Sequence, residues 1–262
     1  MRSNHVLEQW RQGKATMGGW LSIGNALTAE LMGQLGFDWL CVDLQHGQIS
    51  SADLHHMLPA ISATPSLPFV RVSWNDPAEI MKVLDAGAYG VIVPMVNTAA
   101  EAQQAVAACR YPPDGNRSFG PIRAALYGGS GYARHANQEM ACVAMIETQA
   151  ALDNLDAILG VPGLDAIYVG PSDLGLARGR SPIGDTDDPA HVQDVMHILA
   201  RAQAHGVTAG IHTGSLAFAQ RWLEAGFQMI TLGIDSGFMA RAASADLRAI
   251  RARMDELTSA EG

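Results

Sequence analysis

Acidic and imidazole side chains follow several short apolar runs in this chain. Asp43 ends one run with His46 three residues later, Glu147 ends another, and Asp173 follows a third. A carboxylate beside an imidazole orients the ring and raises its basicity, as a general base requires. Two carboxylates with open positions suit a hard divalent cation such as Mg²⁺ or Mn²⁺. These residue types therefore favour proton transfer beside a metal ion.

Each of these groups also has a plainer interpretation. Helix starts commonly hold acids because the helix macrodipole favours negative charge there, so Glu147 and Asp173 could be solvated carboxylates. His46 could be an exposed loop histidine near a capping aspartate. Arg71 lies inside an apolar run, where an unpaired charge is costly, so it faces either an anion in a site or a structural partner such as Asp43.

Eight apolar runs alternate with helical stretches along the chain. The runs begin near Met17, Trp39, Phe69, Gly90, Cys142, Ala166, Thr208 and Met229. Such strands, separated by amphipathic helices, predict a parallel sheet covered by helices, and eight units in 262 residues predict a closed α/β (β/α)8 barrel. An open doubly wound sheet is the alternative, but it would usually show a glycine-rich phosphate loop, and neither common form of that loop is present. No change of composition marks a linker, so residues 1–262 are predicted to form one domain.

In a barrel of this kind the chemistry lies at the C-terminal ends of the strands. The fold would therefore bring polar groups from distant segments to one rim, namely Asp43, His46, Arg71, Glu147, Asp173 and His212. A long segment from about Tyr111 to Ala133, rich in glycine and proline, is predicted to be a functional loop.

Composition excludes several classes of function. The net charge is -9 with only 17 Lys and Arg residues, which argues against nucleic acid or an anionic membrane as partner. The lysines are Lys14 and Lys82, and neither follows a predicted strand. A Schiff-base mechanism needs its amine in the barrel mouth, so it is not expected here, and a metal would have to supply any electrophilic catalysis. The G-x-S-x-G elbow of serine hydrolases is also missing.

The cysteines indicate a reducing compartment. There are three, an odd number, and their spacing fits no zinc motif. Cys41 and Cys142 lie in apolar runs and are interpreted as small core residues. The polar N-terminus has no signal-peptide pattern and no apolar run reaches 18 residues, so a cytoplasmic location is expected.

Several segments occur in an order that is typical of one enzyme family. They are Gly36–Asp43 with His46, Phe69–Arg71, Asp85–Ala88 with Val93–Met95, Arg110–Pro113, Ile146–Thr148 and Gly170–Leu174. In these the chain resembles the metal-dependent, class II pyruvate aldolases of the HpcH/HpaI group, which act on 4-hydroxy-2-oxoheptanedioate or 2-dehydro-3-deoxyglucarate. The resemblance covers nearly the whole chain, and Arg-Tyr-Pro-Pro and Gly-Pro-Ser-Asp-Leu are its specific motifs.

The resemblance implies a metal site and a pyruvate site. Glu147 and Asp173 would bind Mg²⁺, Mn²⁺ or Co²⁺, and pyruvate would chelate that ion through its keto oxygen and a carboxylate oxygen. Gly170, Ser172 and Asp173 would bind the substrate, and the backbone amides around Ser172 and Asp173 would hold the pyruvate carboxylate.

The resemblance also assigns the catalytic side chains. Arg71 would face the keto oxygen, and His46 with Asp43 would form a base dyad that acts directly or through water. Trp20, at the end of the first strand, matches a position that lines the pocket of the aldehyde acceptor. The implied reaction is the reversible aldol cleavage of a 4-hydroxy-2-oxoacid to pyruvate, or a close analogue such as hydroxypyruvate, and an aldehyde.

The chain departs from the family pattern on the acceptor side. Met145 replaces a frequent glutamine, residues 120–129 differ, and His212 adds a polar group that we expect to line the substrate site. Two other functions stay open: a CoA-ester lyase of the citryl or malyl type, which would need a basic nucleotide site, and a non-catalytic oxoacid-binding barrel.

The last helix bears on assembly. Family members exchange this helix between barrels and form hexamers that are trimers of dimers. Apolar residues recur at near-helical spacing from Phe238 to Met254, so the helix could be exchanged or could pack on its own barrel.

Overall fold

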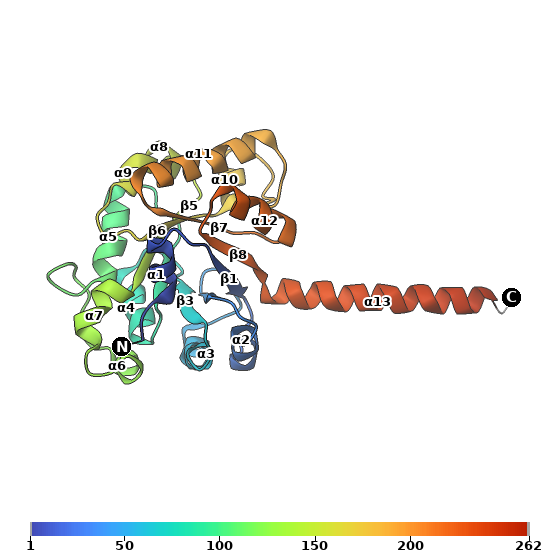
Figure 1. Ribbon diagram of the computed structural model, residues 1–262, viewed down its shortest axis with the longest axis horizontal. Helices are drawn as coiled ribbons and strands as arrows, with labels where there is room; N and C mark the ends of the chain where they lie inside the picture. The colour runs from blue at the N-terminus through green and yellow to red at the C-terminus, as the bar shows by residue number, and fades with distance from the viewer. Residues whose placement is uncertain (1, 261–262) are drawn as a thin grey trace.

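The computed structural model describes residues 2–260, so the ends of the predicted domain range, Met1 and residues 261–262, lie outside it. Eight parallel strands close into a barrel in sequence order, and β8 pairs with β1, which confirms the predicted barrel (Figure 1). The strands are β1 (Thr16–Leu21), β2 (Trp39–Asp43), β3 (Leu67–Arg71), β4 (Gly90–Val93), β5 (Ala141–Ile146), β6 (Ala166–Val169), β7 (Thr208–Ile211) and β8 (Met229–Ile234).

Helices surround this barrel, and several of them begin at capping residues. Pro77 opens one helix at its first turn, and Ser50 and Thr98 form capping boxes at two others. The helices are α1 (His5–Arg11), α2 (Ala26–Gly33), α3 (Ser51–Ser62), α4 (Pro77–Asp85), α5 (Ala99–Cys109), α6 (Ile122–Gly128), α7 (Tyr132–Glu139), α8 (Gln149–Asp153), α9 (Leu155–Leu159), α10 (Pro171–Ala177), α11 (Pro189–His205), α12 (Leu216–Ala225) and α13 (Asp235–Ala260).

Strand register decides which residues meet at the barrel mouth. The pairing of β2 with β3 runs without a shift and sets Asp43 opposite Arg71. The pairing of β5 with β6 ends with Ile146 opposite Val169, so Glu147 and Gly170 are the next residues on the two strands. Because parallel strands keep their C-terminal ends on one side, both pairs reach the same rim.

The barrel core is filled by large side chains beside small ones. Trp39 and Phe69 are fully buried, with ring centroids 5.7 Å apart. Glycine makes room for each of them. A Cβ at Gly18 would lie 2.2 Å from the Trp39 indole, and one at Gly90 would lie 2.1 Å from the Phe69 ring. Such close packing holds the strand ends, and with them the site, in fixed positions.

Three segments differ from the sequence prediction. The predicted loop over residues 111–133 contains α6 and the start of α7, which are short and lack side-chain caps. The helical stretch expected after the apolar run at Cys142 is broken into α8 and α9 at Asn154, whose side chain bonds to the carbonyls of Asn97 and Ala150. The irregular stretch after β6 begins with α10. Tertiary hydrogen bonds and packing outweigh weak local signals in short helices.

Only the start of the last helix packs on its own barrel, where Phe238 lies against the core, so the alternative of packing along the whole helix is wrong. It spans 26 residues and projects away from the barrel, coloured red in Figure 1. Its apolar residues Met239, Leu247, Ile250, Met254 and Leu257 are between 48% and 60% exposed. Within residues 2–260, no helix has the length and hydropathy needed to cross a membrane.

Candidate active site

A cavity of about 230 Å³ lies at the C-terminal mouth of the barrel, where the sequence places the chemistry. Predicted site residues from five strand ends line it together. They are Trp20, Asp43, His46, Arg71, Gly170, Ser172, Asp173 and His212. Ser22, Met145, Tyr168, Pro171 and Ile234 complete the wall. The fold thus gathers these residues as predicted, and Glu147 lies just behind Gly170.

Asp43 and Arg71 form a buried ion pair with two hydrogen bonds. The Arg71 Nε atom donates to Asp43 Oδ1 at 2.8 Å, and its Nη2 atom donates to Oδ2 at 2.6 Å. Burial raises the pKa of Asp43, but the hydrogen bonds and charge of Arg71 outweigh it and leave the pKa below its usual value. The structural partner considered for Arg71 is therefore present, and it fixes the guanidinium toward the cavity.

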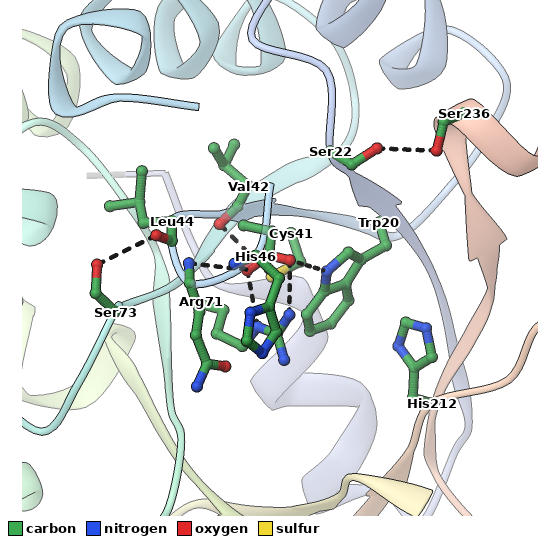
Figure 2. Close-up of polar contacts among 12 residues, drawn as sticks. Trp20, Ser22, Cys41, Val42, Leu44, His46, Arg71, Ser73, His212 and Ser236 are labelled. Atoms are coloured by element: carbon green, nitrogen blue, oxygen red, sulfur yellow. Dashed lines mark hydrogen bonds and ion pairs between the residues drawn. The ribbon is translucent and has the colours of Figure 1, made fainter. Parts of the chain in front are cut away.

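Asp43 also holds the surrounding loop and wall. The Trp20 indole Nε1 donates to Asp43 Oδ2 at 3.1 Å, and the backbone amides of Gln45 and His46 donate to Oδ1 (Figure 2). The His46 bond comes from its amide rather than its imidazole, which stands exposed at the rim. In this structure the Asp43 carboxylate therefore pairs with Arg71 and holds the loop that carries His46. It does not bond to the His46 imidazole, as the predicted dyad would.

Glu147 is a buried carboxylate whose pKa shifts in the direction opposite to that of Asp43. It is 2% exposed, and the hydrogen bond to its Oε1 comes from the Met95 amide at 2.8 Å. Burial raises its pKa to about 7, the Met95 amide opposes this, and the negative charge of nearby Asp173 adds to it. A shift of this size corresponds to about 3 kcal/mol of preference for the protonated form.

The space beside Glu147 is kept open by glycine. A Cβ at Gly170 would lie 2.3 Å from Glu147 Oε2 and 3.1 Å from its Cβ. Gly170 was predicted to bind substrate, and the structure shows that its missing side chain makes room for this carboxylate. The signal is visible in the sequence only as a glycine directly after a strand.

Asp173 and Ser172 belong to the first turn of α10, which begins after Gly170 without a side-chain cap. Both side chains are exposed to the cavity side of the barrel. Within residues 2–260, no three His, Cys, Asp or Glu side chains gather at one point to hold a metal. Glu147 and Asp173 fit a hard divalent cation as a two-carboxylate set, with the remaining positions left to water and substrate.

The opposite wall is aromatic and neutral. His212 meets Trp20 edge-to-face, with ring centroids 5.0 Å apart (Figure 2). The His212 Nδ1 atom lies 3.3 Å from the Tyr168 hydroxyl. The Tyr168 hydroxyl also contacts the Thr231 hydroxyl. Burial, and then the charge of Arg71, lowers the pKa of His212 to about 4, so its ring is neutral at pH 7. Sequence reasoning missed Tyr168 and Thr231, whose only signal was a polar atom inside an apolar strand.

Comparison with known proteins agrees with this fold. The model of the HpcH/HpaI aldolase/citrate lyase family matches residues 16–242, a span that contains the whole barrel. A hydroxypyruvate/pyruvate aldolase from Rhizorhabdus wittichii is 44% identical over 94% of this chain and 100% of its own length. A 4-hydroxy-2-oxo-heptane-1,7-dioate aldolase from Salmonella arizonae is 38% identical over 92% of each chain.

A solved structure gives the same result. An HpcH/HpaI aldolase/citrate lyase family protein from Burkholderia cenocepacia superposes with a TM-score of 0.89 at 34% identity, over 95% of this chain and 100% of that one. The fold and the site define a (β/α)8-barrel lyase. The chain belongs to the HpcH/HpaI aldolase/citrate lyase family and is an enzyme of the aldolase type.

Proposed function

We propose that this enzyme is a divalent-metal-dependent aldolase that reversibly cleaves 4-hydroxy-2-oxoacids to pyruvate, or its close analogue hydroxypyruvate, and an aldehyde. The main observation behind this proposal is the placement of Glu147. Its buried carboxylate lies beside Asp173, in the barrel mouth that also holds Arg71. The names of the curated relatives, both aldolases that form or use oxoacids, support the same reaction class.

The chemistry follows from the placement of these groups. Glu147 and Asp173 would hold Mg²⁺, Mn²⁺ or Co²⁺, and a cation there supplies Lewis acidity for the enolate charge. Arg71, held by Asp43, faces the keto oxygen and stabilises the same charge, an interaction worth about 3 kcal/mol in comparable sites. Removal of Glu147 should therefore abolish metal binding, whereas removal of Asp43 should misplace Arg71.

His46 is the group at the rim that we assign to proton transfer. Its imidazole would accept the proton of the C4 hydroxyl, directly or through one water, as the C3–C4 bond breaks. The bonding electrons pass to C3, the aldehyde leaves, and a proton then returns to C3 of pyruvate. Because the Asp43 carboxylate bonds to the His46 amide, Asp43 assists by ordering the loop that carries the ring.

The remaining wall residues would bind the two substrates. We assign the pyruvate carboxylate to the backbone amides of Ser172 and Asp173, because the α10 N-terminus there has no side-chain cap. Trp20 and His212 face the other side of the cavity and would contact the carbon chain of the substrate.

The test is a metal-dependent turnover assay. Chelated protein is supplied with Mg²⁺, Mn²⁺ or Co²⁺ and a panel of 4-hydroxy-2-oxoacids, and pyruvate release is followed. We expect release only with metal. Release without metal, or cleavage only of CoA esters, would overturn the proposal, and binding of oxoacids without any turnover would indicate a non-catalytic barrel.

We also propose that the chain assembles as a hexamer, a trimer of dimers, through exchange of α13. Leu247, Ile250, Met254 and Leu257 form one exposed stripe along this helix. An apolar groove of about 510 Å³ between α2 and the start of α13, lined by Leu27, Leu31 and Leu35 among others, offers a complementary surface. Light scattering should give a hexamer, and Ile250→Glu should shift the mass toward smaller species. A wild-type monomer would contradict this assignment.

A cytoplasmic location completes the proposal. It is supported by Cys41, Cys109 and Cys142, which are all buried and unpaired by disulfides. Fractionation of the native host with activity assays on each fraction would test it.

A further inference from the structure

Met95 has a backbone conformation that the rest of the site depends on. Its φ of 56° is the one left-handed value among non-glycine residues in the described part of the chain. Side chains disfavour this region because the Cβ crowds the following carbonyl. The conformation turns the Met95 amide toward Glu147, whose Oε1 it meets at 2.8 Å. Strain of this kind persists only where neighbouring groups hold it in place.

Asn97 is the group that holds it. The Asn97 side-chain amide donates to the Met95 carbonyl at 2.8 Å, which closes the turn after β4. The hydroxyl of Thr148, the residue after Glu147, donates to the Asn97 side-chain oxygen. One side chain therefore ties the turn after β4 to the turn after β5, directly beside Glu147.

Other contacts anchor Asn97 itself. Its backbone amide donates to Glu101 Oε2 at 2.6 Å, within the capping box of α5. Its carbonyl accepts from Asn154 Nδ2 at 3.0 Å on the outer side. The Asn97 side chain is thus the inner end of a hydrogen-bonded chain that leads from α5 to the Met95 carbonyl.

We infer that Asn97 is a positioning residue for the metal-binding carboxylate, acting through the strained Met95 amide. The amide occupies Glu147 Oε1 and leaves Oε2 against the open space at Gly170, so the carboxylate is oriented before any cation arrives. The inference rests on the proposed role of Glu147 as a metal ligand. Partners that orient ligands in this way typically change metal affinity by about 10- to 100-fold when they are removed.

The test measures Mn²⁺ binding to the full-length protein without substrate, by the electron paramagnetic resonance signal of free Mn²⁺. Asn97→Ala should raise the Mn²⁺ dissociation constant about 10-fold or more. Met95→Gly should leave it within about twofold, because glycine adopts the left-handed conformation freely. Asn154→Ala removes the outer bonds to the Asn97 and Ala150 carbonyls but keeps the Asn97 side chain, so it is the control and should also leave the dissociation constant unchanged.

A rescue experiment separates positioning from general damage. The double variant Asn97→Ala with Met95→Gly should recover part of the lost affinity, because glycine no longer needs to be forced into the turn. Circular dichroism and thermal melts check that each variant folds. If Asn97→Ala fails to fold, Asn97→Ser takes the same titration with the same expectations.

The outcomes distinguish this inference from the proposed function. If Glu147→Ala still binds Mn²⁺ at the site, the proposed metal ligand is wrong. If Glu147→Ala loses Mn²⁺ but folded Asn97→Ala binds it as tightly as wild type, only the positioning role is overturned. Equal losses with and without Met95→Gly would also overturn it, because the affinity would not depend on the turn.

Discussion

Asp43 and Glu147 are carboxylates at the ends of two strands, β2 and β5, of one barrel mouth, and both are 2% exposed. Their pKa values nevertheless move in opposite directions. Asp43 receives two hydrogen bonds from Arg71 and one from Trp20, so protein groups compensate its charge. Glu147 faces the like charge of Asp173. The two residues carry the same functional group, a carboxylate. Protein groups compensate its charge at Asp43, whereas at Glu147 the charge is available to a ligand.

This difference explains why the two sides have different tasks. A charge that is already paired inside the protein stays fixed and can orient a guanidinium throughout the reaction. A buried charge that is poorly paired is costly, and a divalent cation removes that cost when it binds. The following variants and conditions test whether the Asp43 side and the Glu147 side of the mouth act separately.

The largest effect is expected from Glu147→Gln. This variant should lose Mn²⁺ binding and reduce kcat by at least about 10³-fold, because metal-assisted charge stabilisation supplies several kcal/mol. The metal-free fold should become more stable at pH 8, since a buried charge has been removed. Glu224→Gln on the exposed face of α12 is the control. Titration, steady-state kinetics and melting curves check the three effects together. Turnover near the wild-type rate would mean that the metal is held elsewhere.

Asp43→Asn should produce the next largest effect, and a different one. Arg71 would keep its burial but lose its charged partner, which typically costs about 3 kcal/mol or more of stability. We expect kcat to fall about 10²-fold while Mn²⁺ affinity changes little. Asp156→Asn, at the exposed pair with Arg201, is the control and should leave the melting temperature unchanged. A variant that loses Mn²⁺ binding as strongly as Glu147→Gln would show that the two sides are not separate.

Gly170→Ala tests the space beside Glu147. The added Cβ would lie 2.3 Å from Glu147 Oε2, so the carboxylate must move away from the cation position. We expect Mn²⁺ affinity to fall about 10-fold or more, with the Asp43–Arg71 pair intact. Gly120→Ala, where a Cβ meets nothing within 4 Å, is the matched control. Tight Mn²⁺ binding by Gly170→Ala would show that the glycine is not needed for the site.

The smallest effect is a pH dependence confined to the Glu147 side. Because the folded pKa of Glu147 is about 7, Mn²⁺ affinity should fall about fivefold from pH 7 to pH 6 and level off above about pH 8. Without metal, the fold should lose stability as pH rises from about 4.5 to 7, because the unfolded chain releases this proton more readily. Calorimetric titration in two buffers should detect proton release on binding at pH 6. A pH-independent affinity would contradict the raised pKa.

The barrel could be predicted from the sequence because its signals are repeated and local. Each apolar run such as Trp39–Asp43 or Ala166–Val169 forms a buried strand, and eight of them in a row admit few other folds. Helix starts with strong caps, such as those at Ser50 and Thr98, were also predictable. The weakly specified segments were not, and α6, α7 and the break at Asn154 depend on contacts with distant residues.

The sequence by itself determined which side chains reach the mouth, because the C-terminal ends of all strands in a parallel barrel lie at the same rim. Only the tertiary structure decided how they pair. Asp43 bonds to Arg71 instead of the His46 ring because β2 and β3 are in register there. Met95 turns its amide to Glu147 because Asn97 and Thr148 lock two turns together. Partner choice depends on register and packing between elements, and no local pattern in the chain records those.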